Sequence, residues 1–221
     1  MERHILVVLP HPDDEAFGIS GTLAMHIERG TPVTYACLTL GEMGRNMGSP
    51  PFANRVTLPA IRRRELEASC RAIGIRDLRM LGYHDKTIEF EDPARLDGDI
   101  GRLLAELRPS LVITFYPGYS VHPDHNATGA AVVRAIGKLP PEERPRLYCV
   151  AFARNTREDL GEPDVVIDVR PYLPKKIASI TAHRSQFAAA DQLASGQVPQ
   201  REIEDRFGTE HFWVYRFAEQ A

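Results

Sequence analysis

Two apolar runs, each followed by a His-Pro-Asp turn and a helical pattern, constrain this chain more than any other feature. The first run covers residues 5–9 and leads into Pro10-His11-Pro12-Asp13-Asp14-Glu15. The second covers residues 111–116 and is followed shortly by Val121-His122-Pro123-Asp124-His125. Short apolar runs rich in β-branched residues are typical of buried strands, and a proline suits the first turn of a helix. Each motif therefore predicts a strand that turns into a helix, with imidazoles and carboxylates in the turn.

Helix capping explains only part of this pattern. Acidic residues in the first turn of a helix interact favourably with its dipole, by roughly 0.3–1 kcal/mol each, which accounts for Asp13, Asp14 and Glu15. Capping explains neither His11 at the end of a strand nor a second such turn far along the chain. Clustered histidines and aspartates at two strand ends favour a metal site instead.

The rest of the chain alternates strand and helix patterns. Strands are predicted at 4–10, 32–40, 78–81, 110–116, 146–152, 165–169 and 212–217, and helices at 13–29, 61–73, 95–107, 123–136, 172–187 and 199–206. This alternation predicts a single α/β domain over residues 1–221, with a Rossmann-like, doubly wound and mainly parallel sheet. The irregular stretch 41–58 is long for a loop in a compact domain, which is typical of a lid or a binding loop.

The predicted topology brings the two motifs together. In a doubly wound sheet the first and fourth strands are neighbours at the switch point, where ligands bind. One rim is therefore expected to carry His11, Asp13, Asp14, His122 and His125. Two imidazoles and one carboxylate are a common ligand set of catalytic zinc, which keeps a fourth position for water, and a second carboxylate nearby can act as a general base. Spacing alone leaves open which carboxylate binds the metal, and Fe(II), Co(II) or Mn(II) fit the same donors.

Composition narrows the functional classes. The formal net charge is −3 and no basic stripe is present, so nothing favours binding to nucleic acid or to an anionic membrane. The apolar runs are too short to span a bilayer, and the first strand pattern begins too soon after Met1 to leave room for a signal peptide. Cys37, Cys70 and Cys149 are widely spaced and are interpreted as reduced core cysteines, so we expect a cytoplasmic protein.

Several short motifs make the chain similar to a known enzyme family. They are Pro10 to Glu15, Gly41-Glu42-Met43-Gly44, Arg62-Arg63-Arg64-Glu65-Leu66, Leu81-Gly82 with Asp85, His122-Pro123-Asp124-His125, and Lys176 with His183-Arg184-Ser185-Gln186. These motifs span almost the whole chain. On these residues the chain resembles the zinc-dependent N-acetylglucosaminyl deacetylases of the mycothiol, bacillithiol and phosphatidylinositol-glycan pathways. Residues 34–46 are most similar to the bacillithiol-biosynthesis deacetylases.

The resemblance implies a role for each matching residue. It implies one Zn²⁺ per chain, with His11, Asp14 and His125 as ligands. Asp13 becomes the general base, His122 a donor to the oxyanion or the leaving amine, and Asp124 a group that orients an imidazole. The implied substrate contacts are Glu42, Arg45, Arg62, Asp85 and Tyr119. Tyr119 departs from the family pattern, because it stands three residues before His122 where the mycothiol enzymes place a tyrosine two residues before.

The resemblance also implies the reaction. We expect a metal-dependent hydrolase that removes acetyl from an N-acetylglucosaminyl conjugate, with N-acetylglucosaminyl-malate as the substrate and a homo-oligomer as the assembly. Other N-acetyl sugars and bacillithiol S-conjugates are alternative substrates. A nucleotide-binding module is a rival class, but the first turn carries His-Pro-Asp-Asp where a Gly-x-Gly-x-x-Gly loop would approach phosphate. A non-catalytic metal-binding regulator is a third reading, disfavoured by the spare carboxylate of Asp13. His183 is interpreted as structural or as a rim contact, because the ligand set is already full.

Overall fold

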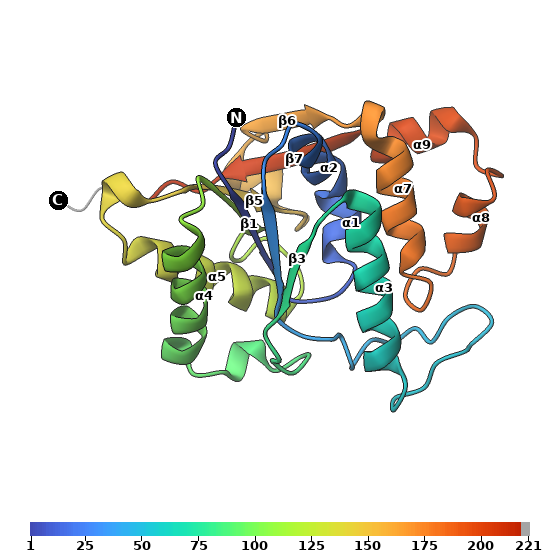
Figure 1. Cartoon of the computed structure of the whole chain (residues 1–221), viewed down its shortest axis with the longest axis horizontal. Helices are drawn as coiled ribbons and strands as arrows, with labels where there is room; N and C mark the ends of the chain where they lie inside the picture. The colour runs from blue at the N-terminus through green and yellow to red at the C-terminus, as the bar shows by residue number, and fades with distance from the viewer. Residues whose placement is uncertain (218–221) are drawn as a thin grey trace.

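The computed structural model describes residues 1–217, and one seven-stranded sheet runs through the molecule (Figure 1). Its strands are β1 (Ile5–Leu9), β2 (Val33–Cys37), β3 (Asp77–Met80), β4 (Leu111–Phe115), β5 (Arg146–Val150), β6 (Val165–Asp168) and β7 (Thr209–Val214). Their spatial order is β3-β2-β1-β4-β5-β7-β6. Strands β1 to β5 run parallel to one another, whereas β7 is antiparallel to β5 and β6. The predicted doubly wound, mainly parallel sheet is confirmed, with β1 beside β4.

Helices cover both faces of the sheet (Figure 1). They are α1 (Asp14–Gly18), α2 (Ser20–Glu28), α3 (Leu58–Ile73), α4 (Pro93–Leu107), α5 (Pro123–Gly137), α6 (Thr156–Leu160), α7 (Leu173–Ala182), α8 (Ala190–Ala194) and α9 (Gln200–Phe207), with single 3-10 turns at Ile88–Phe90, Pro141–Glu143 and Arg170–Tyr172. Helices α2 and α3 pack on one face, and α4 and α5 on the other. Among residues 1–217, no helix has the length and apolar character needed to cross a membrane.

Strand β1 shows why the first apolar run lacks polar interruptions. Ile5, Val7 and Leu9 pack into the core beneath α2 and α3, whereas Leu6 and Val8 pack beneath α4 and α5. Because successive side chains of a strand point to opposite faces, a strand covered on both sides must be apolar throughout. Strand β4 is also buried throughout, and its one polar side chain, Thr114, donates its hydroxyl to the Val8 carbonyl at 2.8 Å.

One long predicted helix is two helices in the structure. The prediction of a helix over 13–29 is wrong at Ile19, which separates α1 from α2 with φ −142° and ψ −7°. The neighbouring residues Gly18, Ser20 and Gly21 are poor helix formers. The Ser20 hydroxyl also donates to the Ala16 carbonyl at 2.6 Å, a bond that bends helices.

The C-terminal part departs further from the predicted boundaries. Helix α7 ends at Ala182 rather than at residue 187, because Glu65 accepts hydrogen bonds from the Ser185 backbone N–H at 2.7 Å and its hydroxyl at 2.6 Å. The short helices α6 and α8 were not predicted. Strand β7 begins at Thr209, three residues before the predicted start, because Thr209 pairs with Asp168 of β6.

A buried ion pair joins four of these elements. Lys176 of α7 pairs with Glu210 of β7, and each side chain is 1% exposed. The Glu210 carboxylate also accepts from the backbone N–H groups of Gly21 and Thr22, at 2.9 and 2.7 Å. The Lys176 ammonium donates to the Phe17 carbonyl at 2.7 Å. The family marker Lys176 therefore has a structural role, since it joins α7 to β7 and to the helices that follow the first motif.

Replacing Lys176 by methionine is expected to lower the free energy of unfolding by about 3–5 kcal/mol, because it leaves the Glu210 carboxylate buried without its cation. Lys175→Met is the matched control, since Lys175 pairs with Glu28 where both side chains are largely exposed. The control is expected to cost less than about 1 kcal/mol. Urea unfolding followed by circular dichroism measures both, and equal losses would remove the special role of the buried pair.

Candidate metal centre

Both His-Pro-Asp turns lie at the carboxyl ends of neighbouring strands. The first follows β1 and opens α1, and the second follows β4 and opens α5. Each turn holds a non-glycine residue with positive φ: Asp13 at 108° and Val121 at 59°. Such backbone conformations are costly and gather at functional sites, where the surroundings fix them. The turns are therefore built to hold the side chains beside them in a set arrangement.

Donor atoms of three side chains from the two turns lie close together. The Nδ1 atom of His11 lies 3.2 Å from Nε2 of His125, and Nε2 of His125 lies 3.1 Å from Oδ1 of Asp14. The other Asp14 oxygen lies 3.5 Å from Nδ1 of His11. Ligands bonded to tetrahedral zinc at about 2.0–2.1 Å are about 3.3 Å apart. These contacts, which use both oxygens of Asp14, therefore fit three side chains that hold a single metal ion.

The His125 ring is fixed by its other nitrogen and by stacking. Its Nδ1 lies 3.2 Å from the Ser120 carbonyl oxygen, which can accept an N–H from this nitrogen, and Nε2 is the nitrogen that faces Asp14. The ring also stacks on Phe115 of β4, with centroids 4.0 Å apart and planes 13° apart. A ligating imidazole normally donates its second N–H in this way.

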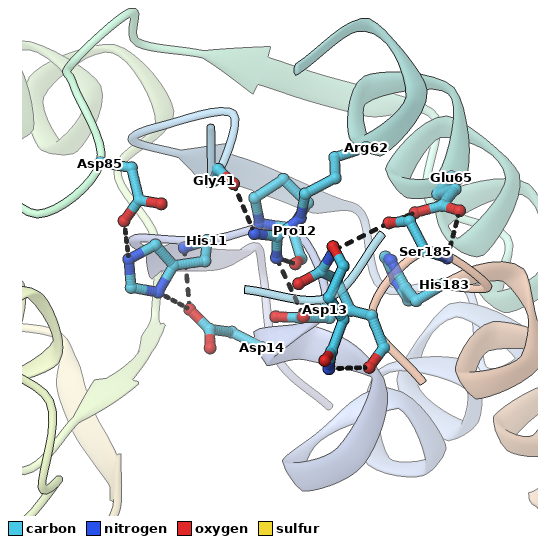
Figure 2. Close-up of polar contacts among 12 residues, drawn as sticks. His11, Pro12, Asp13, Asp14, Gly41, Arg62, Glu65, Asp85, His183 and Ser185 are labelled. Carbon is cyan, nitrogen blue, oxygen red and sulfur yellow. Dashed lines mark hydrogen bonds and ion pairs between the residues drawn. The ribbon is translucent and has the colours of Figure 1, made fainter. Parts of the chain in front are cut away.

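His11 is oriented by two carboxylates on its far side. Its Nε2 lies 3.1 Å from Oδ1 of Asp85 and 3.1 Å from Oδ2 of Asp124 (Figure 2 shows the Asp85 contact). Burial would lower the pKa of His11, but Asp124, Asp14 and Asp85 raise it well above its ordinary value. Hydrogen bonding at Nε2 leaves Nδ1 to act as the ligand. Both Asp85 and Asp124 therefore serve His11, where the resemblance assigned only Asp124 to this role.

These two carboxylates are themselves held by backbone amides. Asp124 is fully buried and accepts from the N–H groups of Lys86 at 2.7 Å and Ile88 at 3.3 Å. Asp85 accepts from the N–H of Met43 at 2.8 Å. Loop 41–57 and the turn after β3 are thereby attached to the residues around His11.

Two donor sets within residues 1–217 have one atom from each residue close enough to share one ion. His11, His122 and His125 form one, and His11, Asp85 and Asp124 the other, with atoms within 4.8 Å of each other in each set. His122 accepts the Asp124 backbone N–H at Nδ1, at 3.1 Å, as the N-cap of α5. Burial lowers the pKa of His122, and the neighbouring His11 and His125 lower it further. A neutral His122 with an occupied Nδ1 carries its proton on Nε2 and can donate from there.

Asp13 lies beside the cluster and is held by Arg62 of α3 (Figure 2). The Arg62 guanidinium donates to an Asp13 oxygen at 2.9 Å, to the Gly41 carbonyl at 2.8 Å and to the Pro12 carbonyl. Burial raises the pKa of Asp13 to about 6, although Arg62 opposes the shift. Gly41 has a φ of 61°, and a Cβ atom there would lie 1.9 Å from the guanidinium, so a larger residue would strain the backbone and displace Arg62. Arg62 lines the site but has its guanidinium committed to positioning Asp13, which differs from the substrate contact that was expected.

A second buried pair lies behind Asp13. Glu15 and His183 are both 0% exposed, with 2.7 Å between Oε1 and Nε2. Burial would lower the pKa of His183, but Glu15 raises it overall, and His183 in turn lowers the pKa of Glu15. The second Glu15 oxygen accepts the Asp13 backbone N–H at 3.2 Å. His183 is thus a buried structural residue that supports the first motif and not a rim contact.

An open cavity of about 480 Å³ gives access to the cluster. Its lining residues are His11, Asp13, Asp14, Met43, Gly44, Arg45, Arg62, Asp85, Lys86, His122, His125 and Gln186. Sequence reasoning missed Lys86 and Gln186, although both stand beside or within family markers.

Two of the predicted substrate residues lie outside this lining. Glu42 accepts from the backbone N–H groups of Leu40 and Asp85, both at 3.2 Å, and so shapes the loop. Tyr119 turns its hydroxyl toward Asp159, at 3.2 Å. The departure of Tyr119 from the family spacing is therefore accompanied by an orientation away from the cluster.

Comparisons with known proteins identify the family of this chain. The family model described as GlcNAc-PI de-N-acetylase, PIG-L, matches residues 6–136. A Bacillus anthracis protein described as a probable N-acetyl-alpha-D-glucosaminyl L-malate deacetylase 2 is 49% identical over 99% of this chain and 98% of its own. Its Bacillus subtilis counterpart is 47% identical over 98% of this chain and 99% of its own.

Solved structures share the fold at lower identity. The N,N'-diacetylchitobiose deacetylase of Pyrococcus horikoshii superposes with a TM-score of 0.75 and 24% identity, covering 97% of this chain and 84% of its own. The 4-carboxy-2-hydroxymuconate hydratase GalB of Pseudomonas putida superposes with a TM-score of 0.73 and 19% identity, covering 99% of each chain. Because proteins of different activity share this fold, the fold alone does not define the reaction.

Proposed function

Because this chain belongs to the PIG-L family of GlcNAc-PI de-N-acetylases, we propose that it hydrolyses the acetamide of N-acetylglucosaminyl-malate. One observation carries this proposal: the donor atoms of His11, Asp14 and His125 converge while a further carboxylate, Asp13, stands beside them. Three ligands and a separate base are what metal-assisted amide hydrolysis requires.

Zinc is the metal that we propose for this cluster. Two imidazole nitrogens and one carboxylate suit its preference for mixed N and O ligands. A bound zinc ion would polarise the amide carbonyl and acidify water. Support for one ion comes from the donor distances and from the second nitrogens of His11 and His125, which are both engaged by oxygen atoms.

The other residues of the cluster take complementary roles in this proposal. Asp13 accepts the proton of the attacking water, because its carboxylate opens on the cavity while Arg62 fixes its position. His122 donates from Nε2 to the developing oxyanion or the leaving amine. The carboxylates of Asp85 and Asp124 orient His11.

We also propose a cytoplasmic location. Cys37, Cys70 and Cys149 are buried and free, and burial raises the pKa of each thiol. Cysteines that stay unpaired are typical of a reducing compartment.

The proposed malate specificity depends on cations at the cavity rim. Arg45 and Lys86 are exposed and line the cavity, whereas the Arg62 guanidinium is already bonded to three oxygen atoms. Malate adds two carboxylates to the sugar, and a guanidinium pairs with carboxylates in a charge-assisted, bidentate manner. We therefore assign the malate group to Arg45, with Lys86 as a second cation.

The kcat/KM for N-acetylglucosaminyl-malate is expected to exceed that for free N-acetylglucosamine by at least about a hundredfold, equivalent to about 2.7 kcal/mol. Arg45→Gln is expected to shrink this ratio at least about tenfold with metal content retained. Arg64→Gln is the matched control, because Arg64 is exposed on α3 outside the cavity lining. A panel that adds other N-acetyl sugars and bacillithiol S-conjugates completes the test, and equal rates on malate-bearing and malate-free compounds would contradict the assignment.

A further inference from the structure

A second cavity of about 470 Å³ adjoins the metal cluster. It shares Asp13, Asp14 and His125 with the polar cavity described above. Its remaining lining is apolar apart from backbone: Phe17, Gly18, Phe115, Val150 and Phe152. A cavity lined mainly by polar side chains and a cavity lined mainly by apolar ones therefore meet at Asp13, Asp14 and His125.

The apolar cavity is built from the strands on the far side of the switch point. Phe115 ends β4, Val150 ends β5, and Phe17 and Gly18 belong to α1. The polar cavity instead draws Met43, Arg62 and Lys86 from segments around β2, α3 and β3. A substrate whose reacting carbon lies at the cluster can place one half in each cavity, because the two cavities share Asp13, Asp14 and His125.

Polarity decides which half of the amide enters which cavity. The proposed substrate has a sugar with several hydroxyl groups on the nitrogen side and an acyl group on the carbon side. Hydroxyl groups placed among Phe17, Val150 and Phe152 would lose their hydrogen bonds to water without replacement, which is unfavourable. The polar cavity offers donors from Arg45 and Lys86 and acceptors from Asp85. The sugar therefore occupies the polar cavity and the acyl group the apolar one.

The apolar cavity is far larger than an acetyl group needs. The part of an acetyl group beyond its carbonyl is a single methyl group, which takes roughly the volume of one water molecule, ~30 Å³. The volume of the cavity is about 470 Å³. Phe17 and Phe152 line it and have 40% and 50% of their surface exposed. The surplus volume and its apolar walls suit an alkyl chain of several carbons.

We propose that this apolar cavity is an acyl subsite and that the enzyme also hydrolyses glucosaminyl amides of longer, saturated acyl groups. The inference rests on the proposed function, because it uses the same cluster and the same sugar. Water adds to the carbonyl carbon, the C–N bond breaks, and the departing nitrogen takes a proton. Each turnover then yields one fatty acid and one primary amine.

The direct test compares N-acetyl-, N-butanoyl- and N-hexanoyl-glucosaminyl-malate as substrates of the zinc-loaded enzyme. Each buried methylene is worth roughly fourfold in binding, so kcat/KM for the hexanoyl compound is expected to equal or exceed that for the acetyl compound. A hexanoyl value more than about a hundredfold below the acetyl value would overturn the acyl subsite and leave the deacetylase function intact.

Product binding tests the subsite without relying on catalysis. Calorimetric titration of the zinc-loaded enzyme with acetate, butanoate and hexanoate is expected to show affinity rising along the series, roughly fourfold for each added methylene. Equal affinities for the three anions would overturn the proposal. If the acetyl substrate is not cleaved but affinity still rises, the proposed deacetylase function fails and the subsite stands.

Gly18 offers a way to fill the cavity. A Cβ atom added there would meet Val150 at an ordinary contact of 3.5 Å, so a larger side chain projects into the space. Gly18→Leu is expected to lower the hexanoyl-to-acetyl ratio of kcat/KM at least about tenfold. Gly18→Ala is expected to lower the ratio about twofold, and it serves if the leucine variant does not fold.

Gly101→Leu is the matched control. Gly101 lies in α4, and an added Cβ would meet no atom within 4 Å in the described structure. Its ratio is expected to equal that of the wild type. If Gly18→Leu instead leaves the hexanoyl-to-acetyl ratio of kcat/KM unchanged and alters the sedimentation coefficient of the protein, the apolar cavity is part of a subunit contact and the proposal fails.

Discussion

Alanine at His11, Asp14 or His125 is expected to leave the protein without its metal ion. The donor atoms of these residues lie 3.1–3.5 Å apart, and a site with three protein ligands has no redundancy. The wild-type protein is expected to carry one zinc ion per chain after dialysis, and each variant less than about a tenth of an ion. Elemental analysis of the purified proteins makes the measurement.

Two further variants test residues of the same cluster that are not proposed ligands: His122→Ala is the control, and Asp124→Asn is expected to have an intermediate effect. His122→Ala is expected to keep the metal, because the His122 ring caps α5 through Nδ1 and supplies no proposed ligand. Asp124→Asn is expected to weaken metal affinity roughly 10- to 100-fold, the usual effect of removing a group that orients a ligating imidazole. Metal loss in His122→Ala together with retention in Asp14→Ala would replace the proposed ligands by the three-imidazole set.

A stability measurement separates metal loss from misfolding. Ligand that binds only the native state stabilises it by about 2.7 kcal/mol at a hundred times its dissociation constant. Zinc added to metal-free wild type is therefore expected to raise the melting temperature. The three ligand variants are expected to melt cooperatively and to show no such rise.

The architecture was predictable because both faces of the sheet are covered. Strands such as β1 and β4 must then be continuous apolar runs, and such runs are visible in the sequence at 5–9 and 111–116. Local helix boundaries were less predictable. The break at Ile19 depends on a hydroxyl-to-carbonyl bond of Ser20, and the end of α7 depends on Glu65, which is 120 residues from Ser185 in sequence.

The edge of the sheet that carries the candidate site could be predicted from the sequence, but the individual side-chain contacts could not. Neighbouring strands explain why His11 and His125 meet, since adjacency of β1 and β4 follows from topology. The contact between Asp13 and Arg62 could not be predicted, because the two residues are 49 positions apart and Arg62 reaches Asp13 by passing close to Gly41. Spacing also could not foresee that Tyr119 turns toward Asp159.

Asp13→Asn is expected to keep its metal and to lose at least about two orders of magnitude in kcat, the usual contribution of a positioned general base. Asparagine keeps the size of the side chain, and its carbonyl oxygen can still accept from Arg62. It cannot take a proton from water at neutral pH. Asp168→Asn is the matched control, since Asp168 pairs with Arg170 on the exposed edge of β6, and its kcat is expected to stay within about twofold of wild type.

Measuring kcat and metal content together on Asp13→Asn and Asp14→Asn shows which carboxylate is the general base and which is the metal ligand. Asp14 touches both imidazoles of the cluster, whereas the contact made by the Asp13 carboxylate is to Arg62. We therefore expect Asp14→Asn to lose metal and activity in parallel, and Asp13→Asn to lose activity alone. If metal falls in parallel with activity in Asp13→Asn and stays bound in Asp14→Asn, the two roles are exchanged, because a base can be removed without releasing the ion and a ligand cannot.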